Sequence, residues 1–89
     1  MPEEKKETQI GKVAHYFPKI NVGVIELTDT LKVGETIHLK GNTTDFEQVV
    51  ESMQIEHKNV GEVKAGESVG LKVNEPAKEG DVVYRIEQD

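Results

Sequence analysis

Apolar residues recur at every second position of this chain, in short runs separated by turn-forming residues. Residues 68–73 illustrate the pattern, because Val69, Leu71 and Val73 alternate with glycine and lysine. Strict alternation indicates a β-strand with one face buried. The other runs of this kind cover residues 9–17, 22–27, 36–40, 46–56 and 82–86. Six strands at roughly ten-residue spacing predict a small all-β barrel or sandwich.

The chain is too short to support more than one hydrophobic core. It has 89 residues, of which 35% are hydrophobic, and a domain of this size buries only roughly 60–65% of the surface of its unfolded chain. A closed barrel is favoured over an open sheet, because closure leaves no exposed strand edge. We therefore expect one six-stranded closed β-barrel over residues 9–89, preceded by a flexible polar tail at residues 1–8.

Residues 46–56 allow two interpretations. The apolar positions change phase between Val49 and Val50, which is typical of a bulge midway along a bent strand. Alternatively, Asp45 would cap a helix, because apolar residues also follow it at helical spacing up to Met53. The strand is favoured, and the helix stays open as the alternative.

The charge balance disfavours diffuse binding to nucleic acid. Eleven basic and seventeen acidic residues give a net charge of −6, whereas binding to a phosphate backbone relies on a positive field. The lack of cysteine excludes disulfides and thiolate metal sites. No apolar stretch is long enough for a membrane span, and the polar start does not have the composition of a signal peptide. These features predict a cytoplasmic protein with no membrane partner.

Groups that could carry catalysis or bind a metal ion are scattered along the sequence. Ser52 does not lie in the Gly-x-Ser-x-Gly motif that exposes a nucleophile on a strand-to-helix turn. Ser68 lies within Gly66-Glu67-Ser68-Val69-Gly70, but we expect it to start a strand instead of occupying such a turn. The histidines His15, His38 and His57 show no spacing that makes them converge, and alternation places His38 on the outer face of its strand. The sequence therefore predicts no catalytic residue, no metal site and no cofactor, and hence no enzyme.

The aromatic residues are assigned mainly to the core. Those predicted to be buried are Phe17, Phe46 and Tyr84. Tyr16 is equally consistent with the core and with the surface. If the chain contacts RNA, an exposed Tyr16 with Lys12 and Lys19 nearby would provide a stacking surface and positive charge.

Four short motifs occur in a fixed order along the chain. They are Leu-Lys-Val-Gly-Glu at residues 31–35, Glu-Ser-Met-Gln-Ile-Glu-His-Lys at 51–58, Ala-Gly-Glu-Ser-Val-Gly at 65–70 and Gly-Asp-Val at 80–82. Their order and spacing resemble the second domain of translational GTPases, the β-barrel of elongation factor Tu and elongation factor one-alpha. The resemblance covers about residues 10–86 and implies a barrel of that type. It does not extend to GTP hydrolysis, because the chain contains no Gly-x-x-x-x-Gly-Lys-Ser/Thr loop.

The resemblance also implies which residues would face a partner. In elongation factor Tu this barrel helps to grip the aminoacylated end of tRNA, and pocket-lining positions of one strand fall on Gln54, His57 and Lys58. The acidic pair of that pocket falls near Ile10 and Gly11 and is lost. The complete candidate set for RNA or partner binding is Lys12, Tyr16, Lys19, Gln54, His57 and Lys58.

A second resemblance rests on Phe46-x-Gln48 ahead of the strand segment at residues 50–53. This version of the barrel is similar to the C-terminal domain of collagenase-like peptidases, where it accompanies a separate catalytic domain. The leading interpretation is a non-catalytic binding module, without a GTPase domain, that docks on the RNA–protein machinery of translation, with weak or no direct nucleic-acid binding. The alternative is an accessory interaction domain for a separately encoded peptidase-like enzyme.

Overall fold

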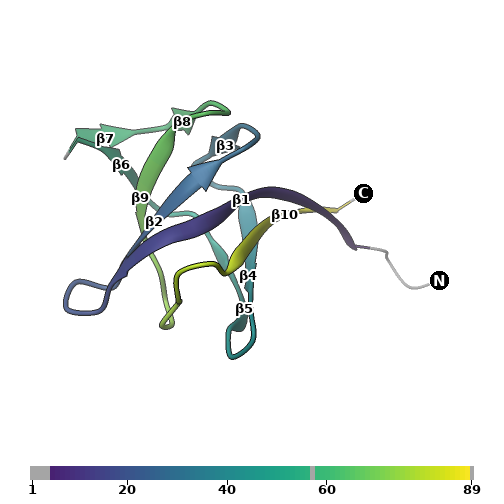
Figure 1. Cartoon of the computed structure of the whole chain (residues 1–89). Coiled ribbons are helices and arrows are strands. Elements are labelled where there is room, and N and C mark those ends of the chain that lie inside the picture. Colours follow the sequence, from purple (N-terminus) through teal and green to yellow (C-terminus); the bar gives the residue numbers. More distant parts are fainter. Residues whose placement is uncertain (1–4, 57, 89) are drawn as a thin grey trace.

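The computed structural model describes residues 5–56 and 58–88 and consists of strands joined by turns (Figure 1). The strands are β1 (Lys5–Phe17), β2 (Val22–Leu27), β3 (Leu31–Lys32), β4 (Thr36–Lys40), β5 (Asp45–Val49), β6 (Met53–Ile55), β7 (Lys58–Val60), β8 (Glu62–Val63), β9 (Ser68–Lys72) and β10 (Val82–Gln88). These residues include no helix, so the predicted all-β fold is confirmed and the helix considered after Asp45 is wrong. Accordingly, no described segment forms a helix that could span a membrane.

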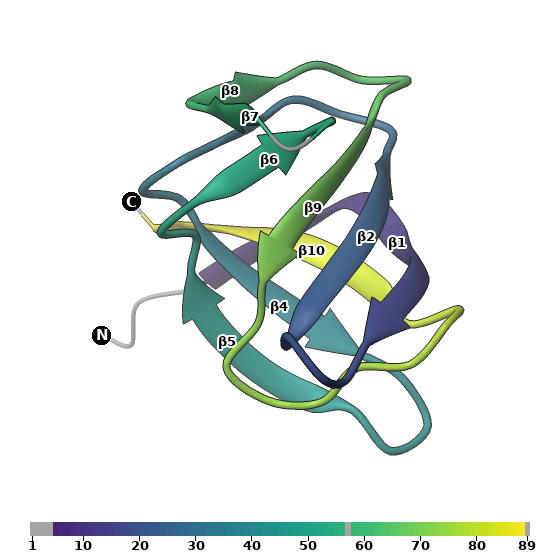
Figure 2. The same cartoon turned by 90° about the vertical axis from the view of Figure 1, so that its left-hand side faces the viewer.

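Eight strands form one antiparallel sheet in the order β5-β4-β10-β1-β2-β9-β6-β7, and β3 pairs separately with β8. The sheet coils around the core, so that β5 at one end of the order comes back towards β9 (Figure 2). Among the described residues, no backbone ladder joins the end strands β5 and β7. The sheet is therefore not closed by hydrogen bonds, and the predicted closed barrel of six strands is not confirmed.

Residues 5–8 belong to the sheet. Lys5 pairs with Gln88, and Thr8 pairs with Arg85 on β10. The predicted polar tail at residues 1–8 is therefore too long by these four residues. Residues 1–4 and 89 lie outside the described part of the chain.

Two bulges in β1 set which of its residues face the core. The register of β1 with β10 shifts at Ile10, and its register with β2 shifts at Ala14. The core-facing residues Ile10, Val13 and Tyr16 consequently follow one another at intervals of three. Alternation in the sequence predicts Ile10 and Val13 on opposite faces, and this is wrong because each inserted residue reverses the alternation.

The bulges also change the roles of the aromatic residues. Tyr16 packs against the core, whereas Phe17, predicted to be buried, is 43% exposed. Phe46 is buried as predicted. Tyr84 is only half-buried, because Val83 occupies the core position instead.

Aliphatic side chains fill the inside of the coiled sheet. The largest fully buried ones include Ile10, Ile25, Leu31, Ile37 and Leu39. Burying a side chain of this size contributes roughly 1.5–3 kcal/mol. Leu31 of β3 also pairs with the buried Val63 of β8, so this separate strand pair covers one end of the core (Figure 1).

The segment from β5 to β6 is interrupted rather than continuous. Val49 is 49% exposed, whereas Val50 and Met53 are both buried. The change of phase therefore lies between Val50 and Met53, and not between Val49 and Val50 as predicted. The interruption at residues 50–52 lets the first half of the segment pair with β4 and the second half with β9.

A side chain bridges the seam between β5 and the end of β9, where the backbone ladder is missing. Gln48 is only 6% exposed. Its Nε2–H donates to the carbonyl oxygen of Lys72 at 2.8 Å, and its Oε1 accepts from the backbone N–H of Asn74 at 2.7 Å. One amide group therefore takes the place of two backbone hydrogen bonds.

Candidate functional site

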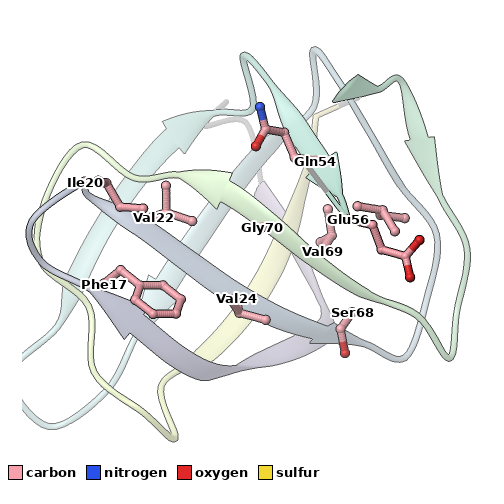
Figure 3. A pocket seen from close by; sticks show the side chains of 10 residues that line it. Phe17, Ile20, Val22, Val24, Gln54, Glu56, Ser68, Val69 and Gly70 are labelled. Carbon is pink, nitrogen blue, oxygen red and sulfur yellow. The ribbon is translucent and has the colours of Figure 1, made fainter. Parts of the chain in front are cut away.

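An apolar groove crosses the outer face of β2, β9 and β6 (Figure 3). Its volume is about 450 Å³. The apolar side chains that line it include Phe17, Ile20, Val22, Val24 and Ile55. Its size and apolar lining are those of a binding surface.

The floor of the groove follows from alternation in two paired strands. Val69 and Leu71 of β9 are buried, so Gly70 between them faces outward, opposite Val24 of β2. Because glycine has no side chain, the outer surface is hollow at this position. A Cβ added to Gly70 would lie 3.5 Å from Cγ1 of Val22, so a side chain there would fill the groove without a clash.

One end of the groove is strongly apolar and the other is polar. Phe17 is 43% exposed and Ile20, in the turn between β1 and β2, is 59% exposed. Glu56 and Ser68 line the opposite end (Figure 3). Exposed apolar side chains that gather in a hollow are typical of interaction sites. The arrangement suits an apolar segment of a partner that carries a hydrogen-bond donor at one end.

The groove contains little of the predicted binding set. Of the five predicted residues that the structure describes, Gln54 alone lines it, with its Nε2–H donating to Asn59 Oδ1 at 3.1 Å. Tyr16 is half-buried, and its hydroxyl donates to Asn21 Oδ1 at 3.3 Å. The exposed members that do not line the groove are Lys12, Lys19 and Lys58. His57 lies outside the described residues.

Phe17 and Ile20 are surface residues that the sequence pattern did not predict. The orientation of Phe17 could not be predicted by alternation, because each bulge in β1 reverses which residues face the core. Ile20 carried a signal that could have been used, since an isolated isoleucine within the turn Lys19-Ile20-Asn21 has no buried strand face to occupy.

A second, polar region lies on the outer face of β4. His38 faces outward as predicted, but its side chain is only 10% exposed. Its Nδ1 lies 2.9 Å from Glu7 Oε1, and its Nε2 lies 2.5 Å from Asp45 Oδ1. Burial lowers the pKa of His38, but the hydrogen bonds and the negative charges of Asp45 and Glu7 together outweigh burial and raise the pKa above its ordinary value of 6.5.

Relatives of known sequence match almost the whole chain. No family model matches it. An uncharacterised protease of Methanocaldococcus jannaschii is 45% identical over 84 residues, which are 93% of this chain and 21% of the protease. A collagenase of Porphyromonas gingivalis is 28% identical over 86 residues, which are 94% of this chain and 24% of the collagenase. The chain thus spans less than a quarter of the length of either relative.

Solved structures share the same architecture. Two crystal structures of the C-terminal domain of a predicted U32 peptidase from Geobacillus thermoleovorans align with TM-scores of 0.81 and 0.82, at 19% identity. The alignments cover 85% and 86% of this chain and 96% and 90% of that domain. The chain has the fold of a U32 peptidase C-terminal domain. This likeness agrees with the resemblance to collagenase-like peptidases, which rests on Phe46-x-Gln48.

The interpretation as a translation-factor module is wrong. The relatives are named protease and collagenase, and the structural neighbours are U32 peptidase domains. Translation machinery is therefore not supported as a partner, and the resemblance to the second domain of elongation factor Tu is not confirmed. The motifs shared with that domain, such as Leu-Lys-Val-Gly-Glu and Ala-Gly-Glu, are turn and strand signals that a small barrel uses whatever it binds.

Proposed function

We propose that this chain is a non-catalytic accessory domain of a U32-peptidase-like protein and that its groove docks on the catalytic part of such a protein. The proposal is supported by the extent of the sequence match, because nearly the whole chain corresponds to less than a quarter of each relative. About four fifths of the Methanocaldococcus jannaschii protease lies outside the match. That remainder is long enough for a separate catalytic domain.

The groove is the surface best suited to such docking. A domain that works beside a larger one buries apolar surface against it. Phe17 and Ile20 are exposed at one end of the groove, and Gly70 keeps its floor open. The occupant that fits this chemistry is an apolar segment of the catalytic part.

Titration calorimetry tests the proposal with the Methanocaldococcus jannaschii protease from which the matched segment has been deleted. We expect this remainder to bind the chain in a one-to-one complex. Ile20→Ser should weaken binding at least roughly tenfold, because it removes a large exposed apolar side chain from the interface. The matched control is Val49→Ser, which changes a 49% exposed residue on β5, outside the groove, and should bind normally.

Three results would count against the proposal. Absence of a complex, or equal losses with Ile20→Ser and Val49→Ser, would exclude docking through the groove. Hydrolysis of gelatin or of a peptide library by the isolated chain would exclude a non-catalytic role. Circular dichroism of both variants separates loss of binding from loss of the fold.

A further inference from the structure

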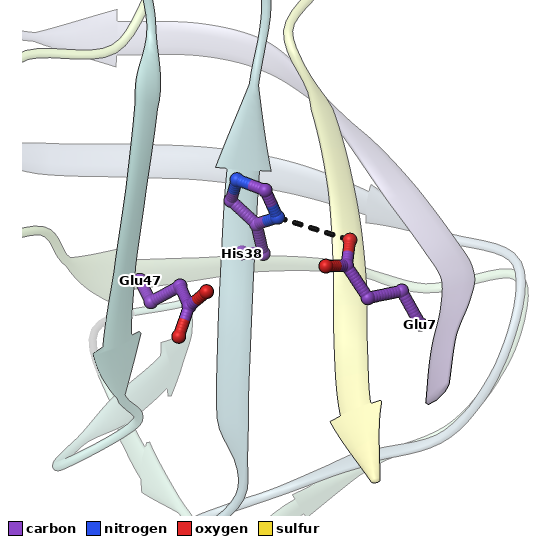
Figure 4. A group of neighbouring side chains, drawn as sticks. All are labelled: Glu7, His38 and Glu47. Carbon is purple, nitrogen blue, oxygen red and sulfur yellow. Dashed lines mark hydrogen bonds and ion pairs between the residues drawn. The ribbon is translucent and has the colours of Figure 1, made fainter. Parts of the chain in front are cut away.

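A buried imidazole and two carboxylates lie together on the outer face of β4 and its neighbours, outside the groove (Figure 4). His38 of β4 is paired across the ladder with Glu47 of β5. Glu7 of β1 reaches the same imidazole from the far side of β10. One ligand atom from each of the three residues lies within 4.8 Å of the other two. Three strands of one sheet therefore supply the three groups.

Asp45 fixes the orientation of the imidazole. A carboxylate oxygen can only accept, so the Nε2–H of His38 donates to Asp45 Oδ1 at 2.5 Å. Metal-binding histidines almost always hold their second ring N–H on a carboxylate, a carbonyl or water in this way. The remaining nitrogen, Nδ1, then points to Glu7, at 2.9 Å from its Oε1.

The position between Nδ1 and the carboxylates favours a cation. Nδ1 lies 2.9 Å from Glu7 Oε1, so a nitrogen that can bind a metal ion faces a carboxylate. A divalent ion in this position would interact with the imidazole nitrogen and with both carboxylates at once. The ring is held in a sheet and is nine-tenths buried, so this ligand is already in place before binding.

We propose that Glu7, His38 and Glu47 bind a divalent transition metal ion of the Zn²⁺ class, with Asp45 as the outer partner of the histidine. Zinc accepts imidazole and carboxylate ligands at about 2.0–2.2 Å. Glu7 and Glu47 are exposed at the surface, so their carboxylates can move in by the roughly one ångström that such distances require. Magnesium and calcium prefer all-oxygen sites, which an imidazole does not provide. Three protein ligands leave a fourth position for water or for a group of a partner.

Zinc titration of the chelator-treated chain tests this site. Calorimetry is expected to give one-to-one binding of Zn²⁺, and nuclear magnetic resonance should show the ring signals of His38 moving before those of the other two histidines. His38→Gln and Glu47→Gln should each weaken binding at least roughly tenfold, and Asp45→Asn by roughly 10–100-fold, the range seen for outer partners of metal ligands. Mg²⁺ should produce no comparable binding.

The matched control is His15→Gln. His15 Nδ1 also lies 2.9 Å from a carboxylate oxygen, that of Glu79, but both side chains are at least half exposed. This variant should bind Zn²⁺ as the unmodified chain does. No binding at millimolar Zn²⁺, equal affinity in Glu47→Gln, movement of the His15 signals instead, or equal binding of Mg²⁺ would each overturn the proposal. None of these results bears on docking through the groove, because the two sites share no residue.

Discussion

The outer surface of the coiled sheet has two regions of opposite character, an apolar wall over β2, β9 and β6 and a polar wall over β4 and β5. Over β2, β9 and β6, the outward residues are small or apolar and leave a hollow (Figure 3). Over β4 and β5, most of them are polar or charged, and carboxylates lie around a histidine (Figure 4). The inner side of both walls is the same aliphatic core. The core therefore restricts the residue type only at the inward positions, whereas the residues at the outward positions can vary and form binding sites.

The two walls also differ in what their outward residues contribute to stability. Phe17 and Ile20 remain exposed, so they gain little from folding. His38 loses most of its hydration, and its hydrogen bonds to Glu7 and Asp45 offset that loss. Substitutions on the apolar wall should therefore affect docking on a partner protein, and substitutions on the polar wall should affect the stability of the fold as well as the binding of a metal ion.

We expect the largest change in the free energy of unfolding at the seam between β5 and the end of β9, where the two walls meet. Gln48→Leu removes both bonds of the bridging amide and leaves the carbonyl of Lys72 and the N–H of Asn74 without their partner. An unsatisfied buried polar group costs about 1–3 kcal/mol, so the free energy of unfolding should fall by about 2–4 kcal/mol. Urea denaturation measures this change.

Gln54→Leu is the control for the seam substitution. Gln54 is an exposed glutamine with a single side-chain bond to Asn59, and its replacement should change the free energy of unfolding by less than about 0.5 kcal/mol. Similar losses in the two variants would show that the seam is not held by the amide.

On the polar wall we expect a smaller change in the free energy of unfolding, and this change should depend on pH. The folded-state pKa of His38 is raised, so its contribution to stability is complete below about pH 6.5 and is lost as pH rises through the folded-state value. In the presence of a chelator, the difference in unfolding free energy between the unmodified chain and His38→Gln should therefore shrink as the pH rises above about 6.5.

Substitution of a partner sharpens this test. Asp45→Asn should remove much of the pH dependence, because Asp45 raises the pKa of His38 by both its hydrogen bond and its charge. Glu51→Gln removes a charge of the same sign from an exposed residue that is not among the groups acting on the pKa of His38, and it should leave the dependence unchanged. A difference that stays flat or grows with pH would contradict a raised folded-state pKa for His38.

On the apolar wall we expect the smallest change in the free energy of unfolding, together with loss of docking on the partner. Gly70→Val would fill the groove, and its Cβ would make only ordinary contacts. We expect a change in unfolding free energy below about 1 kcal/mol and loss of binding to the truncated protease. Gly61→Val, at an exposed position where an added Cβ would meet no other atom within 4 Å, is the control and should retain binding. Normal binding by Gly70→Val would place the interface elsewhere.

The sequence predicted the regular strands well, and the irregular ones poorly. Val69, Leu71 and Val73 lie inward as their alternation requires. In β1, two inserted residues changed the spacing of inward positions. Gly11, beside the first bulge and packed closely against the backbone of Glu26, was a signal that alternation alone did not use. The short pair of Leu31 and Val63 was missed because two residues cannot display a period.

The candidate sites were harder to predict than the fold. Glu7 and His38 are 31 positions apart and meet only across β10, which lies between β1 and β4 in the sheet. The groove depends on the pairing of Gly70 with Val24, which is set by strand order rather than by local pattern. A single sequence shows which residues alternate, but it does not show which strands are neighbours.

Because Lys5 pairs with Gln88, the start of β1 and the end of β10 lie side by side at one end of the molecule. Polypeptide joined before β1 or after β10 would therefore leave the domain at that end, whereas Phe17 lies at the other end of β1 (Figure 1). The longest dimension of the molecule is 43 Å. A catalytic part joined to the chain at that end would have to extend alongside the domain to reach Phe17 and Ile20 at the apolar end of the groove.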